Sequence, residues 1–332
     1  MFQPDIIYYE KEIQDYPLGQ ELMKKYYTVP SVIIENHNKI DELRNQPNTE
    51  IANLKKHLII GVRKTHKYTP NSKVSDFLVP YTSSGCTAMC MYCYLVCNFN
   101  KCSYLRLFVN REQMLEKMIK TANKSDKSLT FEIGSNSDVI LENTITNNLV
   151  WTIENFANSK NGFITFPTKF DMVDDILTIK GKEKIIPRVS MNPQEIINKV
   201  EFGTSRLDER IVAINKLKTA GYKVGILIAP IILVNHWEDL YDTLLKNLAE
   251  KLSDDVKKNV FFELIFMTYS YIHKMINGDM FPNAIDLFDK NLMTARGPGK
   301  YTYKTSVREN ASQFFLEKLK YYFPNGKILY IV

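Results

Sequence analysis

Short apolar runs alternate with longer amphipathic segments from residue 77 to residue 331, and this alternation constrains the fold more than any other feature of the chain. The short runs predict strands, and the longer segments carry apolar residues at helical spacing. Strands that alternate with helices of about ten or more residues are typical of βαβ units, which build a parallel sheet, open or partly closed as a barrel. The sequence therefore predicts the α/β class. The expected strands are residues 77–81, 129–133, 163–166, 185–191, 224–230, 260–266 and 327–331, and the expected helices are residues 111–120, 142–157, 171–180, 207–220, 237–252 and 311–322.

Two regions fall outside the alternation. Residues 1–69 precede it as an N-terminal region, and residues 277–308 carry turn formers without a long apolar run. We expect residues 70–332 to form the domain that contains the parallel sheet. Active sites of such sheets lie at the carboxyl ends of the strands, so the segment after the strand at 77–81 is expected at the functional edge.

Composition excludes several classes of protein. The length of 332 residues allows one large domain or two smaller ones, and 45% hydrophobic with 24% charged residues excludes a disordered or collagen-like chain. The net charge of +6 favours polyanions only weakly. The most apolar stretch, residues 224–234, contains Pro230 and is far shorter than the roughly 18 residues of a membrane span. Because the first residues show no export signal, we expect a cytoplasmic protein without a membrane partner.

All five cysteines lie between residues 86 and 102, which favours metal or redox chemistry over structural disulfides. Cys86, Cys90 and Cys93 form a CxxxCxxC array. Three thiolates can bind three irons of a 4Fe-4S cluster and leave the fourth iron without a protein ligand. A structural zinc site normally needs four ligands, and the five histidines lack zinc-finger spacing. Cys97 and Cys102 could still complete a zinc site or a four-cysteine iron-sulfur site, so a structural metal remains an alternative.

The array resembles the signature of radical S-adenosylmethionine enzymes, in which the open iron binds the methionine part of the cofactor. The resemblance implies a partial (β/α)6 parallel barrel. It also implies two cofactors, a 4Fe-4S cluster and S-adenosyl-L-methionine, which together yield a 5'-deoxyadenosyl radical. The cofactors then generate the radical, and the protein positions the reacting groups and excludes water.

A longer string, from Gly85-Cys86 to Cys93-Tyr94-Leu95, is similar to the spore photoproduct lyase family. That family repairs the thymine lesion 5-thyminyl-5,6-dihydrothymine in DNA. The likeness extends from about Tyr68 to Ile331. Its further motifs occur in the family's order as Phe131-Glu132 with Ser137-Asp138, Thr168-Lys169-Phe170 with Val173-Asp174, Ser190 with Asn192, Gly203-Thr204-Ser205, Leu207-Asp208-Glu209-Arg210, Ala229-Pro230-Ile231 with Trp237-Glu238, Phe262-Glu263-Leu264-Ile265 and Gly299-Lys300-Tyr301.

The resemblance implies roles for particular residues. Cys86, Cys90 and Cys93 would hold the cluster. Tyr94 would stand near the lesion and, with Tyr92, take part in radical transfer. A lysine can form an ion pair with the carboxylate of the cofactor, and a serine hydroxyl can form a hydrogen bond. Taken alone, a lysine or serine at a strand end is also consistent with a solvated side chain. The S-adenosylmethionine pocket would be lined by Tyr92, Ser137, Lys169, Ser190 and Ala229.

One departure from the family concerns the last hydrogen transfer. Better-known Bacillus members place a hydrogen-donating cysteine where this chain has Ser135. An O–H bond is much stronger than an S–H bond, so Ser135 is a poor donor to a thymine allylic radical. Cys97 and Cys102 are the unassigned thiols and are candidate donors, with Cys97 preferred. Alternatively, both are passive or the activity has changed.

A second departure lies in the lesion-binding hairpin that the resemblance places near residues 296–308. The family has an Arg-Tyr pair before Gly-x-Gly-Lys-Tyr, whereas this chain keeps Arg296 and lacks the tyrosine. Strand alternation would put Lys300 and Lys304 on one face and Tyr301 and Tyr303 on the other. Arg296, Lys300 and Tyr301 are the expected DNA contacts, since cations neutralise phosphates and aromatic rings stack on bases. A solvated basic loop over two core tyrosines would have the same pattern.

The resemblance implies a DNA repair lyase that converts the spore photoproduct to two thymines. Its implied partners are UV-damaged DNA and an electron donor such as ferredoxin or flavodoxin, in a spore or a germinating cell. Two alternatives remain open at this point. One is a related radical enzyme with a different substrate, and the other is a DNA-binding protein with a structural metal knot. Zinc without iron-sulfur absorption would support the last of these.

Overall fold

The computed structural model describes residues 2–98 and 104–332, with the backbone alone for residues 97 and 98. The chain divides into two compact units. The described residues within 1–87, 98–168 and 172–186 form the first unit, and residues 88–97, 169–171 and 187–332 form the second. The expected boundary at residue 69 falls inside the first unit and stays a prediction.

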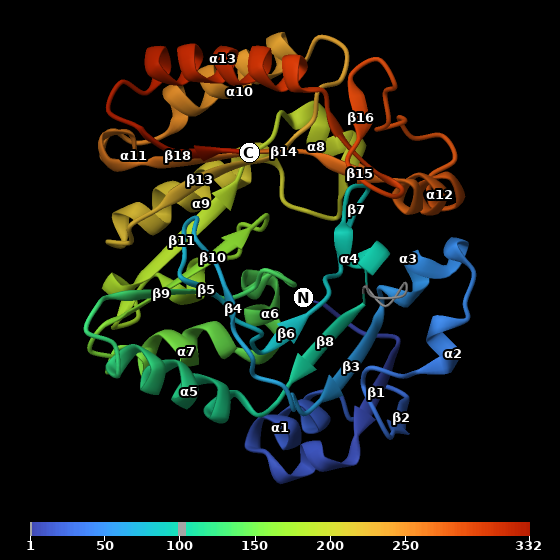
Figure 1. The fold of residues 1–332 in the computed structure, drawn as a ribbon. Coiled ribbons are helices and arrows are strands. Elements are labelled where there is room, and N and C mark those ends of the chain that lie inside the picture. The colour runs from blue at the N-terminus through green and yellow to red at the C-terminus, as the bar shows by residue number, and fades with distance from the viewer. Residues whose placement is uncertain (1, 99–103) are drawn as a thin grey trace. The chain divides into compact units, whose positions relative to one another are not determined.

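The N-terminal region of the first unit contains a parallel sheet that the sequence analysis did not predict (Figure 1). The strand order is β2-β1-β3-β8-β6, and only β6 is antiparallel to its neighbour. Ile7, Leu58 and Leu107 lie in its core and are fully buried. β8 follows residue 69 in the chain, so residues 2–69 share one sheet with later residues. The five strands are β1 (Ile6–Glu10), β2 (Ser31–Ile34), β3 (His57–Gly61), β6 (Ser83–Ser84) and β8 (Leu105–Phe108).

A second set of strands in the first unit has the order β4-β5-β9-β10. β5, β9 and β10 pair in parallel, and β4 is antiparallel to β5. Phe77 stacks on Phe131 with ring centroids 5.9 Å apart, which closes the core under these strands. Their bounds are β4 (Thr69–Pro70), β5 (Phe77–Leu78), β9 (Leu129–Glu132) and β10 (Gly162–Thr168).

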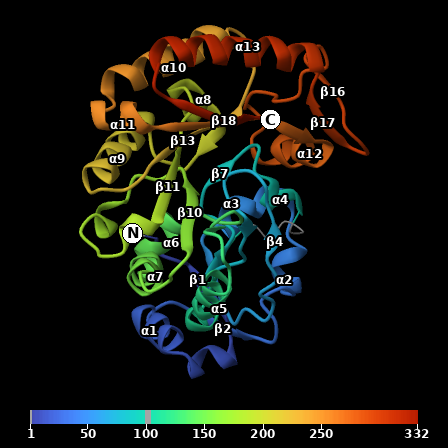
Figure 2. The same ribbon diagram turned by 60° about the vertical axis from the view of Figure 1, so that its left-hand side comes forward.

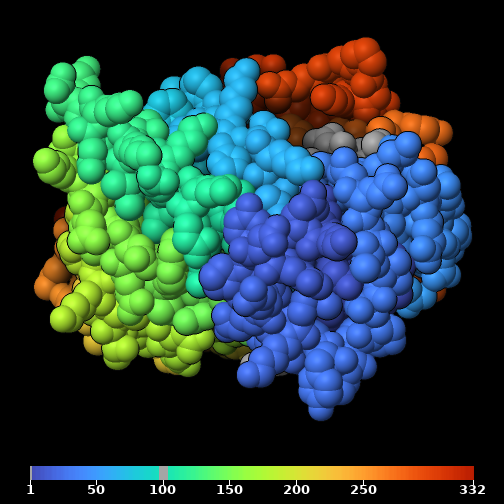
Figure 3. All heavy atoms as spheres, turned by 90° about the horizontal axis from the view of Figure 1, so that it is seen from below, coloured from blue at the N-terminus to red at the C-terminus, as the bar shows by residue number. Residues whose placement is uncertain are grey.

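The remaining elements of the first unit cover these strands. Figure 3 shows its N-terminal residues in blue beside its green segments. Lys25 contributes to this packing by donating a hydrogen bond to the carbonyl oxygen of Ile145, at 2.7 Å. The elements are α1 (Pro17–Lys25), α2 (Asp41–Arg44), α3 (Ile51–Leu54), α5 (Arg111–Asn123), α6 (Val139–Thr146), α7 (Asn148–Phe156) and the 3-10 turns at Lys11–Asp15, Asn48–Glu50, Asp174–Ile176 and Lys182–Lys184.

The second unit is built on four parallel strands in the order β11-β13-β14-β18. The chain enters this unit within β11. Helices α10 and α13 lie side by side, as Figures 1 and 2 show, and Trp237 meets Phe314 edge to face at 5.0 Å between them. The strands are β11 (Ile185–Ser190), β13 (Gly225–Ile231), β14 (Phe261–Phe266) and β18 (Lys327–Ile331), and the long helices are α9 (Leu207–Thr219), α10 (Trp237–Lys251) and α13 (Thr305–Tyr322).

Each strand expected from the sequence overlaps an observed strand, although β5 covers only the first two residues of the expected strand at 77–81, and the predicted α/β class is confirmed. Three expected helices differ. The helix expected at 311–322 begins earlier, at Thr305. The helix at 142–157 is two helices, because Asn147 between α6 and α7 has φ 56°, a left-handed conformation. The prediction of a helix at 171–180 is wrong, because only a 3-10 turn at Asp174–Ile176 forms there. The β-branched residues of that segment, among them Val173 and Ile179, lose side-chain freedom in a helix.

The predicted C-terminal hairpin is present in the second unit. β17 pairs in antiparallel fashion with β16 and with β15. β17 ends at Tyr303, so the prediction that Lys304 continues the strand beside Lys300 is wrong. Lys304 instead precedes α13, and its ammonium donates to the carbonyl oxygen of Asn291. The other elements of this unit are α4 (Tyr94–Asn98), α8 (Gln194–Val200), α11 (Asp254–Asn259), α12 (Tyr271–Met280), β7 (Met89–Cys90), β12 (Glu201–Phe202), β15 (Thr268–Ser270), β16 (Met293–Ala295) and β17 (Lys300–Tyr303).

Among the helices formed by the described residues, none has both the length and the apolar character that crossing a membrane requires.

Candidate active site

Three residues expected to bind a cofactor meet in the second unit. Lys169 directly follows β10, Ser190 ends β11, and Ala229 lies in β13. The Lys169 ammonium donates to the Ser190 hydroxyl at 2.6 Å and to the Ala229 carbonyl oxygen at 2.8 Å. The side chain of Lys169 is 21% exposed, so its charge is partly accessible. The structure thus brings together an ammonium, a hydroxyl and a carbonyl at the carboxyl ends of these strands, where α/β sheets bind ligands.

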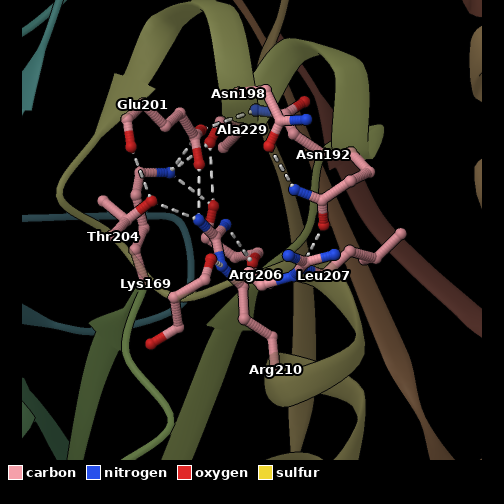
Figure 4. A network of polar contacts seen from close by, with 12 residues as sticks. Lys169, Asn192, Asn198, Glu201, Thr204, Arg206, Leu207, Arg210 and Ala229 are labelled. Atoms are coloured by element: carbon pink, nitrogen blue, oxygen red, sulfur yellow. Dashed lines mark hydrogen bonds and ion pairs between the residues drawn. The ribbon is translucent and has the colours of Figure 1, made fainter.

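A buried carboxylate, Glu201, connects this group to Tyr92, which lies between Cys90 and Cys93. Figure 4 shows Glu201 with Lys169 and Arg210. One of its oxygens lies 3.3 Å from the Lys169 ammonium and accepts a short hydrogen bond from the hydroxyl of Tyr92. The other oxygen lies 2.7 Å from the guanidinium of Arg210. Asn192 donates to Glu201 as well, at 2.8 Å. One carboxylate therefore positions both Tyr92 and Lys169.

The surroundings of Glu201 determine its charge. Burial alone would raise the pKa of Glu201, but the charges of Lys169 and Arg210, with hydrogen bonds from Tyr92 and Asn192, lower it to about 2. Burial, together with the neighbouring Glu201 charge, raises the pKa of Tyr92 well above its usual value. The pair is therefore a neutral phenol that donates to an ionised carboxylate at neutral pH.

Arg210 holds the loop after β12 in place. Its side chain is fully buried and donates to the carbonyl oxygens of Ser190 and Ser205 and to the hydroxyl of Thr204. An arginine presents its donors in a rigid fork, so it can hold several acceptors at once. Arg210 therefore fixes the loop of the Gly203-Thr204-Ser205 motif beside Glu201.

Backbone pairing holds the segment that carries Cys90, Tyr92 and Cys93 within the second unit. β7 and β12 are antiparallel, with Cys90 opposite Glu201. The Cys93 N–H donates to the carbonyl oxygen of Cys90 at 3.0 Å, which makes a tight turn between the two thiols. Asn277, on α12, donates to the carbonyl oxygen of Met91 at 2.7 Å. Strand pairing and helix α12 thus fix the backbone that carries Cys90, Tyr92 and Cys93.

Two expected site residues, Cys86 and Ser137, belong to the first unit. The carbonyl oxygen of Cys86 accepts a hydrogen bond from the Lys55 ammonium at 2.7 Å, and Lys55 is buried. Ser137 accepts a hydrogen bond from the hydroxyl of Ser83 at 2.7 Å. The N-terminal region therefore supports the first cysteine of the array.

The three cysteines of the array are half-buried and form no disulfides. Within residues 2–98 and 104–332, no three His, Cys, Asp or Glu side chains are grouped so that they could hold one metal ion. A 4Fe-4S cluster makes a different demand, because each thiolate binds a separate iron. The side chain of Cys97, on α4, and the whole of Cys102 lie outside the described residues, so their roles stay predictions.

The expected DNA contacts lie on the hairpin. Arg296 and Lys300 are exposed, and the Arg296 N–H donates to the Lys300 carbonyl oxygen across the turn. Tyr301 is half-buried and packs edge to face on Phe288 at 4.7 Å. Tyr303 is buried, and its hydroxyl accepts a hydrogen bond from the Leu233 N–H. Of the two tyrosines, only Tyr301 keeps exposed surface. Tyr94, at the start of α4, is 44% exposed.

Sequence reasoning missed Glu201 and Lys55. Neither residue stands in a motif, and a single Glu or Lys carries no signal of burial. Arg210 was part of a quoted motif but was given no role. Only the contacts of these side chains identify them as parts of the site.

Comparisons with known proteins give one consistent result. The family model described as spore photoproduct lyase matches residues 2–332. The spore photoproduct lyase of Bacillus subtilis (strain 168) is 34% identical, over 99% of this chain and 98% of that protein. A solved structure of spore photoproduct lyase complexed with dinucleoside spore photoproduct matches with a TM-score of 0.92 and 28% identity, over 100% of this chain and 99% of that one. A mutant of spore photoproduct lyase with bound AdoMet and the same ligand matches equally well. These matches confirm the expected partial-barrel fold.

Proposed function

Because the chain belongs to the spore photoproduct lyase family, we propose that it repairs DNA by converting 5-thyminyl-5,6-dihydrothymine to two thymines with a 5'-deoxyadenosyl radical. The observation that carries the proposal is the convergence of Lys169, Ser190 and Ala229, joined through Glu201 to Tyr92 on the cluster loop. A protein with a purely structural metal would not need an ammonium, a hydroxyl and a carbonyl gathered beside the cysteines.

The residues present fit the two cofactors. Cys86, Cys90 and Cys93 are three partly exposed thiols within eight residues, a set that would bind three irons of a 4Fe-4S cluster. When bound, the cluster and S-adenosylmethionine supply the electron and the carbon radical. The ammonium of Lys169 suits the carboxylate of that ligand, and the hydroxyl of Ser190 offers a further hydrogen bond. The family resemblance adds Tyr92 and Ser137 to the proposed contacts of S-adenosylmethionine.

Tyr92 and Tyr94 are the proposed radical-transfer pair. Tyr92 donates its hydroxyl hydrogen to the ionised Glu201, which holds the ring in one orientation. Tyr94 follows two residues later and is partly exposed, which allows contact with a bound lesion. Cys97 or Cys102 supplies the final hydrogen in this proposal, since an S–H bond is weak enough to quench the product radical and Ser135 is not.

The hairpin is the proposed lesion-binding element. Arg296 and Lys300 can neutralise phosphates on either side of the lesion, and Tyr301 can fill the space of an extruded base. The further partner is an electron donor such as ferredoxin or flavodoxin. We place the protein in the cytoplasm of a spore or germinating cell.

The test is anaerobic reconstitution with iron and sulfide, followed by reduction and incubation with S-adenosylmethionine and a synthetic dinucleotide lesion. We expect two thymines per turnover. Lys169→Ala should raise the S-adenosylmethionine Kd at least about tenfold, because it removes a charge-assisted contact. Lys199→Ala, at an exposed lysine of α8, is the matched control. Efficient cleavage of S-adenosylmethionine without any thymine release would contradict the proposed substrate.

A further inference from the structure

The first unit contains a cavity of about 290 Å³ that the proposed repair reaction does not use. It lies at the carboxyl ends of the parallel strands β1, β3 and β8. Glu10 ends β1, Arg63 follows β3, and Phe108 ends β8. Open α/β sheets bind ligands at this edge. None of the residues proposed above for the cofactors or the lesion lines the cavity.

Two arginines line this cavity, and one is half-buried while the other is almost fully buried. The guanidinium of Arg63 lies over the ring of Phe108 at 3.7 Å and donates through Nε to the carbonyl oxygen of Tyr81 at 2.8 Å. Within the described part of the chain, Arg63 forms no ion pair. Arg106, on β8, is 6% exposed. The pKa of Arg63 is lowered to about 10, first by burial and further by the charge of Arg106, against an opposing effect of Glu142.

The carboxylate in the cavity is already satisfied by other donors. Glu10 is 1% exposed and accepts hydrogen bonds from the N–H groups of His37 and Val62 and from the His37 ring. Gly61 leaves room for this arrangement, because a Cβ there would lie 2.8 Å from a Glu10 oxygen. Glu10 therefore orients His37, and no hydrogen bond between Glu10 and either arginine is found among the described residues.

We propose that this cavity binds a phosphate group between Arg63 and Arg106. Guanidinium groups match phosphate oxygens in geometry as well as charge, and an anion between two like charges removes their mutual repulsion. Ser84 and Asn136, also in the lining, offer polar groups for the remaining oxygens. The phosphate belongs either to the DNA backbone or to a free phosphomonoester small enough for the cavity.

The binding test uses the full-length protein, inorganic phosphate and an undamaged DNA duplex as probes. Calorimetry and thermal unfolding would be measured for wild type, Arg63→Gln, Arg63→Lys and Arg106→Gln. Lys24→Gln removes one exposed positive charge of the same unit outside the cavity and is the control. We expect phosphate to bind the wild type and to raise its Tm. Arg63→Gln and Arg106→Gln should weaken binding on the order of tenfold or more, with Arg63→Lys in between.

The outcomes separate the two sources. If phosphate competes with the duplex in the wild type but not in Arg63→Gln, the site reads the DNA backbone. If Arg63→Gln loses phosphate binding but keeps the duplex affinity of the wild type, the ligand is a free phosphomonoester. No phosphate binding by the wild type, or equal binding by all variants, would overturn the proposal. Should Arg106→Gln fail to fold, Arg63→Gln still decides the question, because Arg63 is only half-buried. Thymine release from the dinucleotide lesion should be unchanged in Arg63→Gln, so this result is independent of the proposed repair function.

Discussion

Tyr92 donates its hydroxyl hydrogen to the buried carboxylate of Glu201, so the tyrosine between two cluster cysteines is held by a residue of another strand. The same carboxylate binds Lys169 and Arg210. The positions of Tyr92 and Lys169, which we propose to contact S-adenosylmethionine, therefore depend on one buried carboxylate.

Replacing Glu201 should damage stability and catalysis together. In Glu201→Gln the charge of Arg210 remains fully buried without its carboxylate, and breaking a buried pair from one side costs about 3–5 kcal/mol. Urea unfolding measures this loss, and Glu201→Leu with Arg210→Leu should recover part of it. Glu195→Gln, at an exposed glutamate, should change the unfolding free energy by less than about 0.5 kcal/mol. A loss below about 1 kcal/mol in Glu201→Gln would show that the pair is not coupled as the structure indicates.

Replacing the hydrogen donor should separate cofactor cleavage from clean repair. We expect Cys97→Ala to cleave S-adenosylmethionine normally but to form by-products in place of two thymines, since the product radical is no longer quenched. Cys102→Ala is the parallel variant. Ser135→Cys, in the Cys97→Ala background, should restore thymine formation, because it places a thiol where the family resemblance implies a hydrogen-donating cysteine. Product chromatography decides, and clean repair by the Cys97→Ala, Cys102→Ala double variant would exclude both thiols.

The hairpin cations should act through phosphates. Arg296→Gln and Lys300→Gln should each weaken duplex binding and reduce the slope of log Kobs against log salt by about 0.9, the value for one lost phosphate contact. Fluorescence anisotropy over a salt series measures the slope. Lys320→Gln, at an exposed lysine near the end of α13, should leave it unchanged. Equal slopes for the hairpin variants and the wild type would place the DNA elsewhere.

Glu10 should make the first unit sensitive to acid. Burial would raise the pKa of Glu10, but hydrogen bonds from His37 and Val62 outweigh it and lower the pKa below the usual 4.5. Protonation is therefore harder in the folded than in the unfolded chain. The stabilisation is present above pH 4.5 and disappears as the pH falls through the lower, folded value.

At neutral pH, Glu10→Gln should lower the unfolding free energy by about 2 kcal/mol, since the hydrogen bonds lost are charge-assisted. The difference between Glu10→Gln and the wild type should shrink as the pH falls below 4.5. Urea unfolding at several pH values measures it. Glu12→Gln, at an exposed neighbour, is the control. A difference that is constant from pH 7 to pH 3 would contradict the assignment.

Local patterns determined much of this protein without any structure. Apolar runs such as that ending at Phe266 predicted their strands, because a buried parallel strand needs a continuous apolar segment. The spacing of Cys86, Cys90 and Cys93 indicated the chemistry, because the number of thiolates on one short loop limits what they can bind. The apolar pattern at 171–180 predicted a helix wrongly, because only Val173 and Ile176 are buried there, around a single 3-10 turn.

Tertiary structure alone decided which charges meet. Glu201 and Glu195 are both glutamates near α8, yet strand pairing with Cys90 buries the first, and the second is exposed to water. Arg63 and Arg106 lie 43 positions apart by their numbers, and only the parallel pairing of β3 with β8 brings them to one cavity. Periodicity reports the repeat of a single backbone element, whereas the charge of a buried site depends on contacts between elements that no local pattern encodes.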